Sequence, residues 1–310
     1  MVAGPLTVLA IWLLGGTGML RNVEYHLGHP DHTYTRAREA ATADAVDVLF
    51  IGSSHAYRTF DPRVFAANGL TTFNLGSSNQ TPIQTEALLH RYLHRLNPRL
   101  VVFEVHPDIL AYDGVESSLY WLCNAPPSIH NIPMVIRSHN AKVVCTAIYA
   151  TLHNACSKQF GTFAEEPCID GNCYVRGGFV ERNDEPWKPS PQPADTVHPL
   201  PDQLHALQRT LQWLAKEGVD CLMLEVPDSR ALEEATAGLE EFRQQMRALG
   251  DFHCPRPEAL CDSLHFLDPG HLNPDGARLY CDYITDLIYE HLGTHVRNLA
   301  RRAGPGPVRD

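Results

Sequence analysis

The sequence has little positive charge for its length. Its 310 residues include 25 Lys and Arg against 36 Asp and Glu, which gives a formal net charge of -11. Nucleic-acid-binding domains usually carry a basic surface, so this composition predicts no nucleic-acid partner. The turn Gly52-Ser53-Ser54-His55 also matches neither Gly-x-Gly-x-x-Gly nor Gly-x-x-x-x-Gly-Lys-[Ser/Thr], which argues against a nucleotide-binding protein.

Residues 2–20 contain no charged side chain at all, and Arg21 follows them directly. This length is enough to cross a bilayer, so residues 1–20 are predicted to be a membrane anchor or signal-like segment, with a buried helix as the alternative. No A-x-A-like site follows, which favours an uncleaved anchor over a signal peptide. The polar residues 21–44 are predicted to be a stalk.

These predictions give the chain a membrane partner through its N-terminal helix. We expect a single-pass anchor with the rest of the chain outside the cytoplasm. The positive-inside rule does not favour this orientation, because basic residues follow the apolar run and none precedes it.

The nine cysteines are an odd number, so at least one has no partner within the chain. Cys168 and Cys173 flank an Asp-Gly turn, which suits a disulfide in an oxidising compartment. Zinc is the competing ligand for this pair. The sequence has no second close pair of Cys or His at zinc-finger spacing, so no metal and no other cofactor is predicted.

Short apolar runs alternate with amphipathic stretches from Ala45 onward. Four runs read as strands buried on both faces: residues 45–52, 71–76, 99–105 and 219–226. Four stretches have helical spacing: residues 81–96, 201–218, 229–250 and 273–293. This alternation predicts an α/β fold with a central parallel sheet covered on both sides.

Two segments depart from this alternation. Residues 113–200 are rich in Asn, Pro, Gly and Ser, and are predicted to be an insertion or lid near the carboxyl edge of the sheet. Residues 294–310 end in Arg-Arg-Ala-Gly-Pro-Gly-Pro-Val-Arg-Asp and are predicted to be a disordered tail.

Ligands of open parallel sheets bind at the carboxyl ends of the strands, and three predicted strands end there in polar residues. The first is followed by Gly52, Ser53, Ser54 and His55, and the second by the stretch 74–79, which includes Gly76 and Asn79. The third ends in Glu104, His106 and Asp108. We expect Ser53, His55, Glu104, His106 and Asp108 to line a pocket.

A possible base and carboxylate lie together late in the chain. Asp268 and His271 share a Pro-Gly turn just before the last predicted helix. A serine nucleophile needs a base to take its proton, and the base needs a carboxylate to fix its tautomer. The pair therefore suits a catalytic role. The alternatives are an Asx turn at Asp268, a helix cap at His271, or a base at His265.

The turn with Ser54, the turn with Gly76 and the Asp268–His271 pair follow one another along the chain. In this order they resemble the motifs of the SGNH (GDSL-like) hydrolase superfamily. "FIGSSH" is similar to that family's "FIGDSL", which places Ser54 at the nucleophile and Ser53 at the preceding Asp. Asp268 and His271 match its D-x-x-H, and Gly76 its oxyanion glycine. The resemblance implies a three-layer α/β/α, flavodoxin-like fold over residues 45–293, and it covers roughly residues 45–112 and 200–293.

One part of the family pattern is missing. The third block of the family, Gly-x-Asn, supplies an oxyanion Asn, whereas this chain has Asp108 near that place. Backbone N–H groups of Ser54 and Gly76, with Asn79, are then left to form the oxyanion hole. Losing one donor typically costs about 2.7–4 kcal/mol in the transition state.

Membrane-anchored SGNH-like proteins that modify cell-surface polymers, such as alginate O-acetyltransferases and the D-alanyl transfer protein of the teichoic-acid pathway, similarly have a reduced set of blocks. The resemblance therefore implies a serine-dependent esterase or O-acyltransferase that acts on an acyl ester or an acylated carbohydrate of the cell envelope. Ser54, Asp268 and His271 would be its catalytic residues. The alternative is a catalytically inactive, membrane-tethered binding or assembly protein with the same fold.

Overall fold

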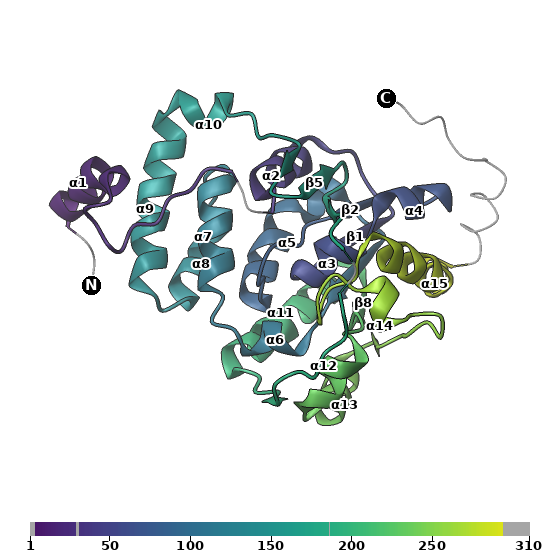
Figure 1. Cartoon of the computed structure of the whole chain (residues 1–310). Helices are drawn as coiled ribbons and strands as arrows, with labels where there is room; N and C mark the ends of the chain where they lie inside the picture. The colour runs from purple at the N-terminus through teal and green to yellow at the C-terminus, as the bar shows by residue number, and fades with distance from the viewer. Residues whose placement is uncertain (1–3, 29–30, 186, 294–310) are drawn as a thin grey trace.

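A five-stranded parallel sheet forms the centre of the molecule, in the order β10-β8-β3-β1-β2 (Figure 1). The computed structural model describes residues 4–28, 31–185 and 187–293. The strands are β1 (Val48–Ile51), β2 (Thr72–Asn74), β3 (Leu100–Glu104), β8 (Asp220–Leu224) and β10 (Phe252–His253). The four predicted strands are confirmed, whereas the two-residue β10 was too short to be recognised from the sequence.

Both faces of the sheet are buried, because successive strand residues point to opposite sides. Leu49 and Ile51 belong to one core cluster, and Val48 and Phe50 to the other. The first cluster is covered by α2 (Thr33–Thr42), α5 (Pro82–Leu96), α11 (Pro201–Glu217) and α13 (Leu239–Leu249), and the second by α3 (Ser54–Thr59), α4 (Pro62–Ala67) and α15 (Pro274–Leu292). The predicted three-layer α/β/α, flavodoxin-like fold is confirmed.

Three of the predicted helices begin and end near the expected residues. α5 starts after Thr81, which forms a capping box with Gln84, and α11 ends at Gly218, whose φ is 71°. The helix predicted over residues 229–250 is wrong. The chain forms α12 (Arg230–Ala235), then the short strand β9 (Thr236–Ala237), and turns at Gly238 into α13, because β9 pairs with β7 (Asp195–Thr196).

The predicted insertion, residues 113–200, follows the short helix α6 (Pro107–Ala111) and has regular structure of its own. It contains the helices α7 (Val115–Asn124), α8 (Asn131–Arg137), α9 (Ala141–Cys156) and α10 (Lys158–Thr162), and the strands β4 (Cys168–Ile169), β5 (Asn172–Val175), β6 (Phe179–Arg182) and β7. α7, α8 and α9 pack together and against α2 and α5, and β6 lies against α3. The role of this segment as a lid stays a prediction.

The stalk predicted over residues 21–44 is wrong. The side chains of Tyr34, Ala37 and Ala40 on α2 are buried, and the two alanines belong to the core beneath α5. Earlier in the segment, the backbone N–H of Gly28 donates to Asn124 Oδ1 at 2.7 Å. The polar composition misled the prediction, because the buried face of α2 consists of alanine, threonine, tyrosine and arginine, which carry little hydrophobic signal.

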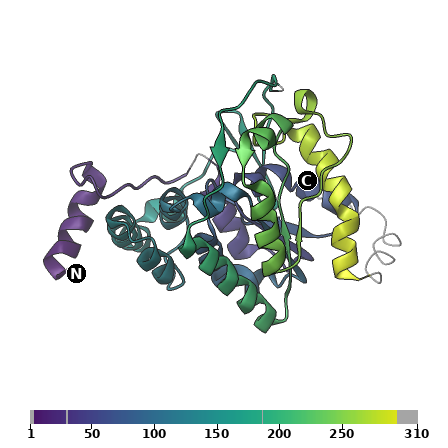
Figure 2. The ribbon, with the colours of Figure 1, turned by 90° about the horizontal axis from the view of Figure 1, so that it is seen from below.

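The N-terminal helix α1 (Pro5–Leu14) has ten residues and lies beside α9 at one end of the molecule (Figures 1 and 2). A helix of this length rises about 15 Å, half of a bilayer's apolar core. It ends because Gly15–Thr17 form a 3₁₀ turn and Gly18 has a φ of 74°. No helix in the described ranges is long and apolar enough to span a membrane, so the predicted transmembrane helix is not supported.

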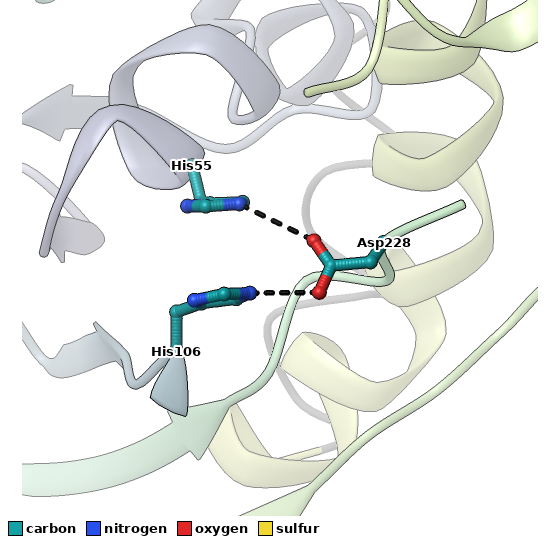
Figure 3. Close-up of side chains that lie close together, drawn as sticks. All are labelled: His55, His106 and Asp228. Atoms are coloured by element: carbon teal, nitrogen blue, oxygen red, sulfur yellow. Dashed lines mark hydrogen bonds and ion pairs between the residues drawn. The ribbon is translucent and has the colours of Figure 1, made fainter. Parts of the chain in front are cut away.

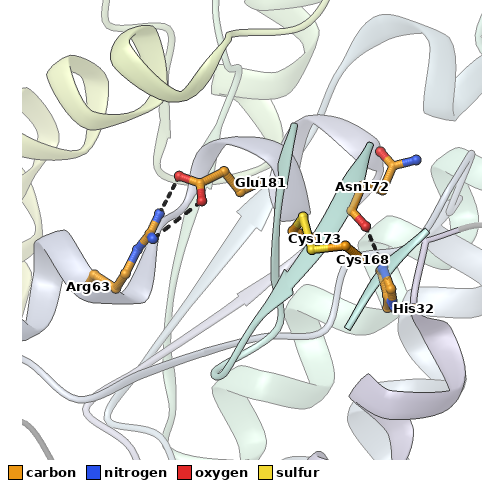
Figure 4. Close-up of a disulfide and its surroundings, with 6 residues drawn as sticks. All are labelled: His32, Arg63, Cys168, Asn172, Cys173 and Glu181. Carbon is orange, nitrogen blue, oxygen red and sulfur yellow. Dashed lines mark hydrogen bonds and ion pairs between the residues drawn. A yellow bond between two sulfur atoms is a disulfide. The ribbon is translucent and has the colours of Figure 1, made fainter. Parts of the chain in front are cut away.

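Cys168 and Cys173 form a disulfide that joins β4 to β5 (Figure 4), which confirms their predicted pairing. Asp170 and Gly171, with φ values of 49° and 80°, make the turn between the two strands. On the same small sheet, the backbone carbonyl of Asn172 lies 2.9 Å from His32 Nε2. The disulfide therefore stiffens a segment that contacts the start of α2. The predicted tail, residues 294–310, lies outside the described residues.

We expect Trp121→Phe to lower the free energy of unfolding by about 1–2 kcal/mol, because it removes a buried hydrogen-bond donor. The indole N–H of Trp121 on α7 donates to Ser77 Oγ at 2.8 Å and thereby ties the insertion to the loop after β2. Urea unfolding measures the change. Trp213→Phe is the control, since Trp213 is less buried and packs against His90 at a ring distance of 4.0 Å. Equal losses of unfolding free energy in the two variants would contradict a stabilising role for the hydrogen bond between Trp121 and Ser77.

Candidate active site

The turn from β1 to α3 places Ser54 at the first residue of the helix. Ser53 is the N-cap, and its hydroxyl accepts the N–H of His55. Gly52 has a φ of 154°, and a side chain there would collide with Glu104. Glu104 Oε2 accepts the N–H of Ser53 at 2.7 Å and its hydroxyl at 2.8 Å. Ser53 is thus a structural hydrogen-bonding residue, and Ser54 is left free to face outward.

Ser54, His271 and Asp268 form a hydrogen-bonded chain. Ser54 Oγ lies 2.7 Å from His271 Nε2, and His271 Nδ1 lies 2.9 Å from both carboxylate oxygens of Asp268. The side chains of His271 and Asp268 are 24% and 45% exposed, so a substrate can approach them. The structure therefore brings together the three residues that were predicted to be catalytic, in the order nucleophile, base and carboxylate.

Backbone hydrogen bonds hold His271 and Asp268 in place in the loop of residues 266–272. Asp268 Oδ1 accepts the backbone N–H groups of Gly270 and His271, each at 2.9 Å. The N–H of Leu267 donates to the carbonyl of His271 at 2.8 Å. Outside the loop, the N–H of Ser229 donates to the carbonyl of Pro269 at 2.8 Å. The base and its carboxylate are therefore held by backbone hydrogen bonds.

The surroundings of His271 favour its neutral form. Burial lowers the pKa of His271 below its ordinary value of 6.5; the hydrogen bond to Asp268 opposes this shift, and the charge of His55 adds to it. Burial raises the pKa of Asp268, but hydrogen bonding and attraction from His271 outweigh that effect and lower it. A neutral imidazole beside an ionised carboxylate is the state that can accept a proton from Ser54.

The predicted oxyanion donors are only partly available. The backbone N–H of Ser54 has no partner within the part of the chain that the structure describes. The N–H of Gly76, in contrast, donates to Asn74 Oδ1 at 2.9 Å, so this predicted donor is already occupied. The side-chain amide of Asn79 donates to Glu116 at 2.7 Å and is also engaged. The structure thus leaves Ser54 as the free donor among the three.

The residues predicted to line a pocket lie mostly below the surface. Ser53, His55, Glu104 and His106 are buried, so they support the triad from beneath and do not form an accessible wall. Asp108 is half-exposed, and its carboxylate accepts the hydroxyl of Tyr112 at 3.4 Å. His265, the alternative base, accepts the N–H of Cys261 through Nδ1 at 2.9 Å and has a structural role.

A buried carboxylate that the sequence did not single out lies beneath the triad. Asp228 follows β8, and its Oδ2 lies 2.9 Å from His106 Nε2 and its Oδ1 3.5 Å from His55 Nε2 (Figure 3). The signal that could have found it is its position, because Asp228 follows the carboxyl end of a predicted strand, as Ser54 does. The stretch "LEVPDSR" was predicted only as the end of a strand and the start of a helix.

His55, His106 and Asp228 are the residue types that bind divalent metals, and the group Asp251, His253 and His291 offers a second such set. In the first group the rings of His55 and His106 are stacked at 4.1 Å with an interplanar angle of 10°. A metal binds imidazole in the plane of the ring, and two parallel rings share no such point. Figure 3 shows both rings directed at the two oxygens of Asp228: His106 forms a hydrogen bond to Oδ2, whereas His55 faces Oδ1 at ion-pair distance.

The comparisons with known proteins give no family assignment. No family model and no curated protein matches the chain. A solved structure from Bacteroides fragilis, provisionally assigned as an acylhydrolase, aligns over 86% of this chain and 100% of its own, with a TM-score of 0.39 and 12% identity. This likeness is too low to support an inference about activity. The case for function therefore depends on the geometry of the site.

We expect Gly52→Ala to lower the free energy of unfolding by at least about 2 kcal/mol, because it adds an unfavourable φ and a collision with Glu104. Thermal or urea unfolding measures the loss. Gly218→Ala is the matched control, since Gly218 also has a positive φ, 71°, but open space around it. If both variants lose the same stability, Glu104 does not fill the space beside residue 52 as tightly as the structure indicates.

Proposed function

We propose that the chain is a serine-dependent ester hydrolase or O-acyltransferase that works through an acyl-Ser54 intermediate. The observation that carries this proposal is the hydrogen-bonded chain of Ser54, His271 and Asp268, with a distance of 2.7 Å from Oγ to Nε2. It connects a nucleophile to an oriented base, which is the arrangement that acyl transfer requires. Ser54 lies 217 residues before His271 in the sequence, so local structure alone does not account for their contact.

In the proposed first half-reaction, Ser54 Oγ attacks the carbonyl carbon of an ester while His271 Nε2 takes its proton. Asp268 stabilises the imidazolium that forms, and the N–H of Ser54 donates to the oxyanion. His271 then gives the proton to the leaving alcohol, and the acyl group remains on Ser54. In the second half-reaction, water or a hydroxyl of an acceptor gives its proton to His271 and attacks the acyl-serine. As the bond between the acyl group and Ser54 Oγ breaks, His271 returns that proton to Oγ, which releases the product and restores the free serine.

A carbohydrate acceptor is the finer part of the proposal. A cavity of about 430 Å³ adjoins the loop after β2 and is lined by Asn79, Tyr112, Asp113, Glu116 and neighbouring residues. Amide, phenol and carboxylate groups form hydrogen bonds with hydroxyls, so this lining suits a hydroxyl-rich molecule. The resemblance to proteins that acylate cell-surface polymers points to the same class of acceptor.

A binding protein without catalysis is the second candidate. The occupied N–H of Gly76 favours it, together with the lack of an Asn at the end of β3. In this alternative the triad is a hydrogen-bonded group that binds an acylated ligand without reacting. The two candidates differ in the reactivity of Ser54.

We expect a fluorophosphonate probe to label the full-length chain at Ser54, because the neutral His271 removes the proton of Oγ as the phosphorus is attacked. Labelling is expected to be lost in Ser54→Ala and to fall by about 10²-fold or more in His271→Ala. Peptide mapping by mass spectrometry identifies the labelled residue. Ser138→Ala is the control, because Ser138 lies at the end of α8 and its hydroxyl donates to the carbonyl of Val135 at 2.8 Å.

Failure of the wild-type chain to react, or labelling that survives Ser54→Ala, would refute the nucleophile and favour the binding protein. For a chain that reacts, an acetyl-ester donor supplied with and without an oligosaccharide separates hydrolysis from transfer. Acetylated oligosaccharide formed at the expense of free acetate indicates a transferase, and unchanged acetate release indicates a hydrolase.

A further inference from the structure

Three imidazole rings form a column beneath the catalytic serine. The ring of His55 stacks on that of His271 with centroids 4.7 Å apart and an interplanar angle of 23°. Its other face stacks on His106 at 4.1 Å and 10°. The three rings come from the start of α3, the end of β3 and the loop before α15. Since His55 is in the middle, its position sets the distance between the other two.

The column is held at one edge by the carboxylate of Asp228. This carboxylate faces both His106 and His55, and its side chain is 8% exposed (Figure 3). Gly270, beside His271, lies over the same edge, because a side chain there would contact His55 Nε2 at 3.4 Å and Asp228 Oδ1 at 3.5 Å. The N–H of Ser229 holds the carbonyl of Pro269. The loop that carries the base thus rests on Asp228 and its neighbour.

The edge of the column carries a buried ion pair. Burial alone would raise the pKa of Asp228, but attraction and hydrogen bonding from His106 outweigh it and keep the pKa below its usual range. Burial likewise opposes charge on His106, yet Asp228 raises the pKa of His106 to about 10. His106 Nδ1 lies 3.7 Å from the carboxylate of Asp108, which favours the cation, and it also accepts the backbone N–H of Asp108 at 3.3 Å, which favours an unprotonated Nδ1. Asp228 therefore holds His106 through Nε2, and His55 lies between that ring and His271.

We propose that His55, clamped by Asp228 against His106, is a positioning residue that holds the ring of His271 in line with Ser54. The inference rests on the proposed function, since it assigns His271 the role of base. A ring fixed on one face by stacking and on one edge by Asp268 cannot rotate away from Oγ. The charge of His55 also lowers the pKa of His271.

The other charged groups around the column are few. Arg58, one turn along α3, adds to the lowering of the pKa of His271, and Asp268 opposes it. The charge of Glu104 helps to raise the pKa of His106, and its Oε2 accepts the hydroxyl of Ser53. The carboxylate of Asp228 contacts His106 and His55, and it can be replaced without changing Ser54, His271 or Asp268. Asp228 is therefore the residue to change.

The test is the pH dependence of fluorophosphonate labelling in Asp228→Asn and His55→Phe, with the full-length chain. In the wild type the labelling rate is expected to fall at acidic pH as His271 becomes protonated. We expect the midpoint of this acidic limb to lie below pH 6.5, because the pKa of His271 is lowered. In Asp228→Asn the rate at high pH is expected to fall about tenfold or more, since misplacement of the base is costly, while the acidic limb stays below pH 6.5, because the burial that mainly lowers the pKa of His271 is kept. In His55→Phe a ring is kept but its charge and its contact with Asp228 are lost, so the limb is expected to move up and the rate at high pH to fall.

The matched control is Asp251→Asn. Asp251 also faces two histidines, His253 at 2.9 Å and His291 at 2.6 Å, but it precedes β10 and lies at the amino edge of the sheet, away from the triad. The Asp251→Asn variant also removes a carboxylate that faces two histidines, but far from the triad. Its rate of labelling and the acidic limb of that rate are therefore expected to match the wild type. Thermal unfolding of each variant separates loss of fold from loss of rate.

A second readout does not depend on reactivity. The titration of His271 by NMR, with its signal identified from His271→Gln, gives its pKa in each variant. In a wild type that is labelled, a high-pH rate that is no lower in Asp228→Asn than in Asp251→Asn would overturn the proposed clamp, as would an NMR pKa of His271 that is the same in His55→Phe as in the wild type. Absence of labelling in the wild type, with an NMR pKa that still rises in His55→Phe, would refute the esterase or acyltransferase function alone.

Discussion

The turn between β1 and α3 depends on the absence of a side chain at residue 52. Glu104 fills the space that a side chain there would take, and its carboxylate binds the N–H and the hydroxyl of Ser53. Ser53 is thereby fixed as the N-cap, so α3 begins at Ser54. A different cap would rotate the helix start and move Oγ away from His271. One glycine and one buried carboxylate on the adjacent strand thus determine where the candidate nucleophile lies.

The same parallel sheet explains why distant residues meet. β1, β3 and β8 are neighbours and end at the same edge, so Ser54, His106 and Asp228 are brought together although 174 positions separate the first from the last. The final loop completes the group because α15 packs on the face of the sheet that α3 also covers. The sheet therefore provides the frame, and the turns after its strands provide the chemistry.

The sequence predicted the parts of this arrangement that are encoded locally. Continuous apolar runs identified four strands, and two short motifs identified Ser54, Asp268 and His271. The role of Asp228 depends on the stacking of three rings from separate segments, which no local pattern contains. The occupied N–H of Gly76 could not be predicted either, since it depends on the rotamer of Asn74. α2 was mistaken for a stalk because its buried face consists of alanine and polar residues.

The buried charges beneath the triad need a reason other than stability. An ion pair removed from water gains little net free energy over apolar side chains of similar volume, because desolvation offsets most of the attraction. A fold that needed only packing under His271 could use leucine or phenylalanine in place of His55, His106 and Asp228. The stacked imidazoles pack as such residues would, and they also place charge within reach of the base. The ionic layer lies one ring away from His271, and His55, the ring between them, is among the groups that lower the pKa of His271.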